Sequence, residues 1–179
     1  MADVGIFFGT DTGTTRKIAK QIHQQLGADL SDKPLNINRV DIDTLSSYKM
    51  LILGTPTLGE GQLPGLAADC QAESWDEFLP QLEVADFSGI KVALFGLGDQ
   101  VNYASEFVDG LGELYDAIAE TGADLVGEWP AEGYEFDDSS ALLDNGKFAG
   151  LVLDNDNQSE LHAERMAGWL EQIKAEFGV

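Results

Sequence analysis

Four short apolar segments constrain the fold of this chain more strongly than any other feature of its sequence. They span residues 4–8, 50–53, 92–95 and 148–153, and none of them contains a polar side chain. Segments this short that are apolar on both faces are typical of strands in a parallel sheet that is covered on both sides. Between them apolar residues recur at helical spacing, as in residues 18–26. The alternation predicts an α/β fold, in which helices cover both faces of a mainly parallel, doubly wound sheet.

The remaining elements give weaker signals. Residues 35–40 alternate apolar and polar side chains, which predicts a half-covered edge strand. Residues 74–77 have the spacing of a capping box and predict the start of a short helix. Residues 107–118 and 161–177 each have one apolar face and predict two more helices, and a further strand begins at Leu125.

The charge of the chain limits its partners. Thirty-two acidic residues against ten basic ones give a net charge of −22. Such a surface is repelled by nucleic acid and by anionic membranes, and it favours a basic protein partner. No segment approaches the roughly 20 apolar residues needed to cross a bilayer, and residues 1–5 lack the pattern of a secretory signal. A single cysteine, Cys70, excludes an intramolecular disulfide. We expect one monomeric, cytoplasmic domain over residues 1–179.

In a sheet of this kind ligands bind beyond the carboxyl ends of the strands. The segment after the first strand, residues 10–15, reads T-D-T-G-T-T and leads into a helix. Backbone amides at such a helix start bind phosphate, threonine hydroxyls add donors, and Gly13 permits a close approach. The lysine that follows the glycine in a triphosphate-binding loop is absent, which favours a single phosphate monoester.

Two other strand ends are also unusual. Residues 54–65 contain four glycines, and Gly59 and Gly61 flank Glu60, so that the peptide joining Gly59 to Glu60 can turn over at low cost. Residues 96–103 begin with small residues and end in an aromatic ring. The three loops together predict a pocket with a phosphate site, a flexible wall and a stacking ring.

This combination resembles the flavodoxin family, whose members carry electrons on one non-covalently bound FMN. The similarity extends over essentially the whole chain. Residues 10–15 are similar to the family's FMN phosphate loop, and residues 55–61 and 96–103 are similar to its two loops beside the isoalloxazine ring. The resemblance implies a flavodoxin-like three-layer α/β/α fold, whose five-stranded parallel sheet has the order 2-1-3-4-5. Residues 127–147 resemble the insertion that interrupts the last strand of long-chain flavodoxins.

The resemblance also implies the cofactor-binding residues. Tyr103 takes the place of the family's stacking tyrosine, and Asp154 lies where members contact the ribityl chain. Leu58 stands where many long-chain members have tryptophan, so the stacking contribution on that side, typically about 1 kcal/mol, would be lost. The full expected set is Thr10, Asp11, Thr12, Gly13, Thr14, Thr15, Thr55, Pro56, Thr57, Leu58, Gly59, Glu60, Gly61, Gly96, Leu97, Gly98, Asp99, Tyr103 and Asp154.

In function, the resemblance implies a low-potential one-electron carrier and not an enzyme. The flavin would shuttle between semiquinone and hydroquinone. Turning the Gly59–Glu60 peptide would present the Gly59 carbonyl to the N5–H group that the first electron creates. The second electron makes an anionic flavin, which a chain of charge −22 without lysine or arginine in either flavin loop disfavours. We therefore expect a strongly reducing second couple.

Acidic side chains are expected to dock basic patches of redox proteins, with a reductase as the electron donor. The sequence T-L-G-E-G at residues 57–61 resembles the flavodoxins that supply nitrogenase, which implies a nitrogenase reductase as acceptor and a role in nitrogen fixation. The acidic residues expected to take part in docking are Glu60, Asp69, Glu73, Asp76, Glu77, Glu106 and Asp109.

Other classes of protein have a related architecture. An FMN-dependent NAD(P)H/quinone reductase would need room for a nicotinamide above the flavin, and a compact Tyr103 plate argues against it. A ligand-free interaction domain would be colourless when purified. A phosphoacceptor receiver domain needs an aspartate at the end of its third strand, where this chain has Gly54. Metal binding is not expected, because His23 and His162 lie on separate predicted helices without ligand spacing.

Overall fold

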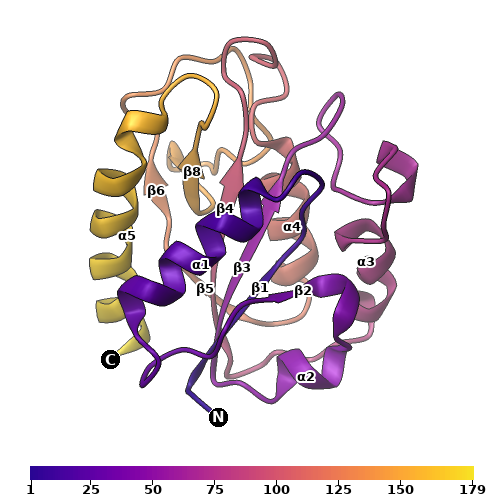
Figure 1. Cartoon of the computed structure of the whole chain (residues 1–179), viewed down its shortest axis with the longest axis vertical. Coiled ribbons are helices and arrows are strands. Elements are labelled where there is room, and N and C mark those ends of the chain that lie inside the picture. Colours follow the sequence, from indigo (N-terminus) through magenta and orange to yellow (C-terminus); the bar gives the residue numbers. More distant parts are fainter.

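The computed structural model describes residues 1–179. A parallel sheet forms the centre of the molecule (Figure 1). The strand order β2-β1-β3-β4-β5 confirms the order implied by the resemblance, and β8 pairs with β4 on the same side as β5. The strands of this sheet are β1 (Val4–Phe8), β2 (Leu35–Asn36), β3 (Met50–Pro56), β4 (Lys91–Leu97), β5 (Asp124–Val126) and β8 (Leu151–Leu153).

Helices cover both faces of the sheet because each central strand is apolar on both sides. In β3, Met50 and Ile52 pack under α1 (Thr14–Leu26) and α5 (His162–Phe177). Their neighbours Leu51 and Leu53 face the other layer. That layer is made of α3 (Trp75–Glu83) and α4 (Asp109–Ala119), together with the short α2 (Ile42–Ser46). None of these helices combines the length and apolar character needed to cross a membrane.

The last strand of the sheet is interrupted, as expected. β5 pairs with Lys91–Ala93 and β8 pairs with Phe95–Leu97, so the two segments occupy successive parts of one strand position beside β4. The intervening residues 127–150, called the insertion below, contain the antiparallel pair β6 (Trp129–Pro130) and β7 (Lys147–Phe148). Phe148 therefore belongs to the insertion, and the expected strand over residues 148–153 begins only at Leu151.

Two other expectations need correction. Residues 35–40 do not form one edge strand, because β2 ends at Asn36 and residues 37–39 form a 3-10 turn. The side chain of Asn36 accepts a hydrogen bond from the Asn38 amide (3.2 Å), which turns the chain away from the sheet. The helix expected over residues 107–118 begins at Asp109, and Phe107 lies buried before it. Further 3-10 turns cover residues 66–68 and 159–161.

Helix α3 begins where the capping-box spacing predicts. The backbone amide of Ser74 donates to Glu77 Oε1 (2.8 Å), and the same carboxylate accepts from the Leu66 amide (3.1 Å). Glu77 therefore fixes both the start of α3 and the loop that precedes it. Trp75, the first residue of α3, donates its indole N–H to the Gly54 carbonyl (2.8 Å) at the carboxyl end of β3.

Candidate functional site

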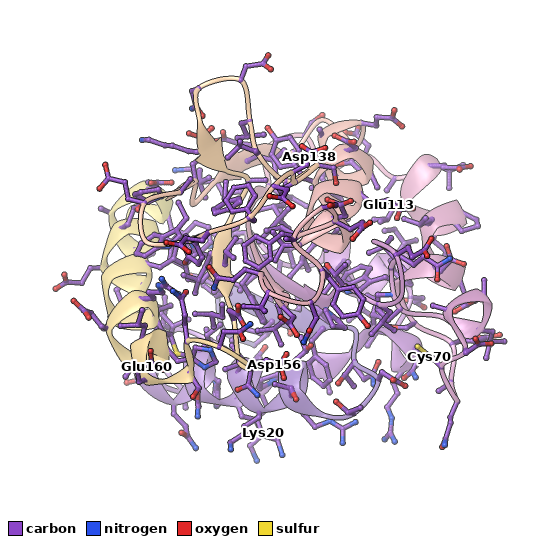
Figure 2. The ribbon with its side chains drawn as sticks, turned by 90° about the horizontal axis from the view of Figure 1, so that it is seen from above. Lys20, Cys70, Glu113, Asp138, Asp156 and Glu160 are labelled. Atoms are coloured by element: carbon purple, nitrogen blue, oxygen red, sulfur yellow. The ribbon has the colours of Figure 1, made fainter.

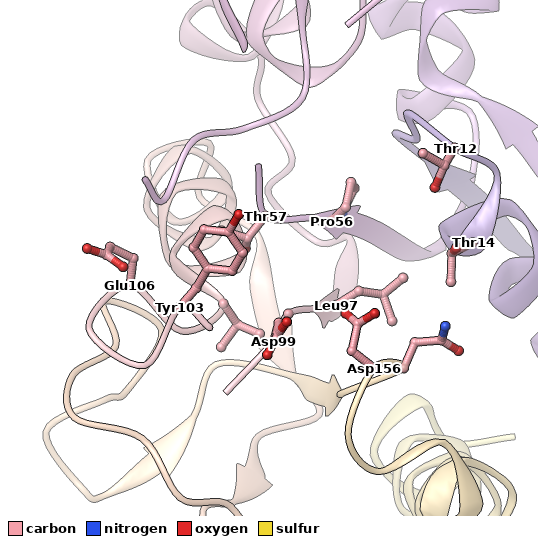
Figure 3. A pocket seen from close by; sticks show the side chains of 12 residues that line it. Thr12, Thr14, Pro56, Thr57, Leu97, Asp99, Tyr103, Glu106 and Asp156 are labelled. Carbon is pink, nitrogen blue, oxygen red and sulfur yellow. The ribbon is translucent and has the colours of Figure 1, made fainter. Parts of the chain in front are cut away.

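A cavity of about 230 Å³ opens at the carboxyl ends of β1, β3, β4 and β8, the edge that the sequence predicts for a ligand (Figure 3). Thr12 and Thr14 lie at one end of it, and Tyr103 and Glu106 lie at the other. Four separate segments of the chain contribute its lining residues, which are Thr12, Thr14, Pro56, Thr57, Leu97, Gly98, Asp99, Tyr103, Glu106, Val108, Asn155 and Asp156.

The threonine-rich loop presents an unusual number of free donors. Its turn is closed by a hydrogen bond from the Gly13 amide to Thr10 Oγ1 (2.9 Å), and Gly13 has a φ of 98°, which favours glycine. The side chains form no cap for α1. The backbone amides that donate no hydrogen bond within the chain are those of Thr10, Asp11, Thr12, Thr14, Thr15 and Arg16. Such a cluster at the positive end of a helix is suited to an anion with several acceptor oxygens.

The cavity contains no cationic side chain. Arg16, the nearest in sequence, has its Cζ 5.6 Å from the centre of the Phe8 ring and lines another hollow beside β2. The lining also includes the carboxylates of Asp99, Glu106 and Asp156. An anionic group is therefore favoured at the loop and disfavoured across the rest of the cavity.

The loop after β3 is held in a tight turn. Leu58 and Gln62 exchange two backbone hydrogen bonds (2.8 and 2.7 Å), and Gly59 and Gly61 both have positive φ, 51° and 95°. Of the expected residues, Pro56 and Thr57 line the cavity and Thr55 is buried beneath it. Leu58, Gly59, Glu60 and Gly61 form the adjoining turn and are not among the lining residues.

The loop after β4 supplies the opposite wall. Leu97, Gly98, Asp99 and Tyr103 line the cavity, whereas Gly96 lies within β4. The Tyr103 ring is 47% exposed at the mouth of the cavity, which leaves a face free for a ligand. Burial raises the pKa of Asp99, but hydrogen bonds from Asn102 and Asn157 outweigh this effect and hold the pKa below its usual value.

Two lining residues from this region were not predicted. Glu106 was expected only on the docking surface. Val108 is fully buried and has a φ of 49°, a rare backbone conformation for a β-branched residue. A Cβ on Gly98 would lie 2.8 Å from Val108 Cγ1, so glycine is needed there. Nothing in the local sequence around Val108 signals this conformation, which depends on the packing of the completed site.

Asp154 occupies a different place from the one expected. It is 0% exposed and does not line the cavity. The two residues after it, Asn155 and Asp156, line the cavity instead. Their position directly after the last strand was the signal that could have identified them. The pKa of Asp156 is raised by burial and by the neighbouring carboxylates of Asp99 and Asp154.

The cysteine and the histidines lie outside the cavity. Cys70 is 8% exposed (Figure 2), and burial together with the nearby Asp11 raises the pKa of its thiol. His23 Nδ1 lies 2.8 Å from Ser31 Oγ. Burial lowers the pKa of His162, whose Nε2 is buried without a partner at the start of α5.

A doubly wound sheet with a donor-rich turn after its first strand and an aromatic ring across the cavity is typical of small proteins that bind a nucleotide cofactor. Residues 6–169 match the family model described as flavodoxin. The chain belongs to the flavodoxin family. The family consists of electron-transfer proteins, so the chain is an electron carrier and not an enzyme.

Similar proteins extend over nearly the whole chain. A flavodoxin of Klebsiella pneumoniae is 58% identical over 174 residues, which cover 97% of this chain and 98% of the relative. Flavodoxin 1 of Escherichia coli K12 is 47% identical over 177 residues and covers 99% of this chain and 96% of its own length. The crystal structure of Fusobacterium nucleatum flavodoxin bound to flavin mononucleotide has a TM-score of 0.87 at 35% identity and covers 99% of both chains.

Proposed function

We propose that this chain is a low-potential, one-electron carrier that binds FMN in the cavity at the carboxyl edge of the sheet. The observation that carries the proposal is the set of six backbone amides without an internal partner over residues 10–16, two of whose residues, Thr12 and Thr14, line a cavity without a cation. These neutral donors suit the phosphate of FMN, and the half-exposed Tyr103 ring suits its flat ring system. Bound FMN would supply reversible transfer of single electrons.

The residues of the chain have distinct tasks in this proposal. Thr10–Thr15 hold the phosphate, residues 55–61 form one wall of the ring site, and residues 96–103 form the other. The positive φ of Gly59 and Gly61 supports a turn whose central peptide can reverse, which would aim the Gly59 carbonyl at a newly protonated ring nitrogen. Asp154 belongs to the site as a buried support, and Leu58 remains the proposed cover of the inner face.

The low potential follows from the charges near the cavity. Asp99, Glu106 and Asp156 line it and no lysine or arginine does, so any further negative charge in the cavity is disfavoured. Burial is the main cause of the raised pKa of Asp156, and repulsion by Asp99 and Asp154 adds to it. For one electron, an electrostatic penalty of 1.4 kcal/mol corresponds to about 60 mV. Several carboxylates acting together would therefore make the bound flavin a strong reductant.

The proposed partners are basic surfaces of a reductase and of nitrogenase reductase. In Figure 2 Lys20 on α1 lies at the lower edge of the molecule, and Glu113 and Asp138 lie in the upper half, away from it. Burial and the nearby Asp76 raise the pKa of Glu113, which indicates crowded negative charge beside α4. A cationic surface on a partner would relieve this repulsion. A monomer in the cytoplasm and a single domain over residues 1–179 remain predictions from the sequence.

An anaerobic reductive titration of the FMN-loaded protein tests the proposal. We expect two separate one-electron steps, the second well below the midpoint potential of free FMN. The reduced protein should then pass electrons to a nitrogenase reductase at a rate that falls as salt is raised. A single two-electron step together with rapid NAD(P)H oxidation would instead identify a quinone reductase. Two one-electron steps without electron transfer to nitrogenase reductase would refute only the proposed electron acceptor.

A further inference from the structure

Three segments that are distant in the sequence meet behind the cavity. They are the loop after β4 (residues 98–103), the loop after β8 (residues 154–158) and residues 133–138 of the insertion. Gln100 is 5% exposed and Asp154 is fully buried at the point where the segments meet. Neither side chain lines the cavity, so neither is accounted for by direct contact with a ligand.

The carboxylate of Asp154 is bound by donors from both loops. Its Oδ2 accepts from the backbone amide of Gln100 (3.1 Å) and from Gln100 Nε2 (2.7 Å). Its Oδ1 accepts from the backbone amides of Asp156 (3.1 Å) and Asn157 (3.0 Å). Asn157 Nδ2 also reaches Asp154 Oδ2 (2.9 Å) and Asp99 Oδ1 (2.8 Å). These donors lie close to the cavity: Asp156 lines it, and Gln100 and Asn157 directly follow the lining residues Asp99 and Asp156.

The side chain of Gln100 extends the network into the insertion. While its Nε2 donates to Asp154, its Oε1 accepts from the backbone amide of Glu135 (2.7 Å). The two ends of the side chain therefore face groups of opposite kind, and a primary amide satisfies both at any pH. An ionised carboxylate at this position would oppose Asp154, and an aliphatic side chain would leave the Glu135 amide without its partner and remove one donor from Asp154.

The insertion holds the same loop at a second point. The backbone amides of Asp137 and Asp138 donate to the Ala104 carbonyl (2.8 and 3.0 Å), and the Phe107 amide donates to the Asp138 carbonyl (3.2 Å). The segment between these attachments and Gln100 carries Tyr103. Its position thus depends on the insertion at both ends.

No cation neutralises Asp154, because the only ion pair in the structure joins Lys49 to Asp3. A buried carboxylate without a cation is costly unless donors satisfy it. Burial of the Asp154 carboxylate therefore requires these donors to stay in place. Because the donors belong to the loops that line the cavity, this requirement also fixes the shape of the cavity. The titratable and charged groups around it are Asp99 and Asp156 on the two loops, Tyr134 in the insertion, and His162 and Arg165 on α5. The Arg165 guanidinium lies over the Tyr134 ring (4.0 Å) and donates to the Gly133 carbonyl and to Gln158 Oε1, not to Asp154.

We propose that Asp154 and Gln100 are positioning residues, which join the insertion to the two loops and so fix the Tyr103 wall of the flavin site. The insertion thereby serves cofactor binding. This inference rests on the proposed FMN site and is independent of the redox partner.

The variant Gln100→Glu tests this proposal, because it places a second carboxylate against Asp154. At pH 8 the introduced carboxyl is opposed by Asp154, and we expect FMN to bind at least about tenfold more weakly than to the wild-type protein. At pH 5.5 the two carboxylates can share one proton, so most of the affinity should return. Gln100→Leu cannot share a proton and should bind weakly at both pH values. Affinities are measured by quenching of FMN fluorescence, and the wild-type pH profile is subtracted.

Gln172→Glu is the matched control. Gln172 Nε2 donates to Glu176 Oε1 (2.9 Å) on α5 and to the carbonyl of Glu128 (2.8 Å), the second residue of the insertion. The change therefore also sets two carboxylates together beside the insertion, but away from Gln100 and the cavity. This variant should keep the wild-type affinity at both pH values. If Gln100→Leu binds FMN like the wild-type protein, or if Gln172→Glu shows the same pH-dependent loss as Gln100→Glu, the proposal is wrong.

Hydrogen exchange on the wild-type protein provides a test that does not depend on a variant folding. FMN binding should slow exchange of the Glu135, Asp137 and Asp138 amides by at least about fivefold, although they lie in the insertion. Protection confined to the loops that line the cavity would overturn the proposal. The fluorescence titration of the wild-type protein tests the proposed function separately. Failure of the wild-type protein to bind FMN in that titration would refute the proposed function itself.

Discussion

Removing the phosphate from the ligand gives the most direct measure of the threonine-rich loop. Riboflavin has the same ring and ribityl chain as FMN but lacks the phosphate. The loop offers six backbone amides without an internal partner and no cation. Any preference for FMN over riboflavin therefore has to come from neutral donors and the α1 dipole.

The expected preference can be worked out from these donors. A hydrogen bond to a charged acceptor contributes about 1.5–3 kcal/mol. If only three of the six free amides bind the phosphate, the total is about 4.5–9 kcal/mol. At 1.4 kcal/mol for each factor of ten, FMN should bind roughly a thousandfold to a millionfold more tightly than riboflavin.

Fluorescence titrations of the apoprotein with each flavin, in a buffer free of phosphate, measure this ratio. Gly13→Ala should then weaken FMN by about tenfold, because a Cβ at positive φ costs about 1–2 kcal/mol and distorts the loop, while leaving riboflavin unaffected. Gly89→Ala is the matched control: Gly89 also has positive φ (84°) and an open Cβ position, but it lies in the turn before β4, outside both the cavity and the insertion. Riboflavin binding within tenfold of FMN would refute the reasoning.

Three further predictions concern the frame around the site. Tyr48 and Tyr134 both have their pKa raised to about 12 by burial, with Tyr48 also donating to Asp32. The stability that these two tyrosines contribute is fully present below pH 10 and is lost as the pH rises through 12. Tyrosinate absorbance should show the two groups ionising above pH 10.5. Ionisation of all four tyrosines below that pH would contradict this. Gly54→Ala should destabilise the protein by about 3 kcal/mol in urea, since its Cβ would fall within the ring of Phe95, and adding Phe95→Leu should recover part of the loss. Cys70 should react with iodoacetamide at least tenfold more slowly in the native protein than in urea, because its thiol is buried and its pKa is raised; equal rates would disprove the burial.

Much of the fold followed from apolar patterning alone. The strands around residues 4–8, 50–53 and 92–95 are fully buried on both faces, so their composition reflects their place in the sheet directly. Residues 35–40 were misread because the side chain of Asn36 competes with the sheet for backbone hydrogen bonds. The strand order came from the family resemblance, since patterning does not specify which strands are neighbours.

The lining of the cavity was predictable where it depends on backbone conformation. It was less predictable where it depends on the packing of side chains. The loop at residues 10–15 was recognisable because glycine and threonine act locally. Asp154 shows the limit: its position at a strand end indicated a ligand contact, but its side chain turns inward to satisfy amides of another loop. The direction in which a carboxylate points depends on donors that are remote in sequence, and Gln100 carries no local signal of this role.

Because the last strand is divided, the sheet has two separate pairings at this edge. β5 pairs with the end of β4 that lies far from the cavity, and β8 pairs with the end beside it. Each has three residues and its own hydrogen bonds to β4, with residues 127–150 between them. Detaching β8 would expose Leu151, Val152 and Leu153, which are fully buried, so this half of the strand position is held by the core as well as by β4. A break at β8 would displace Asn155 and Asp156, which line the cavity, without breaking any hydrogen bond of β5.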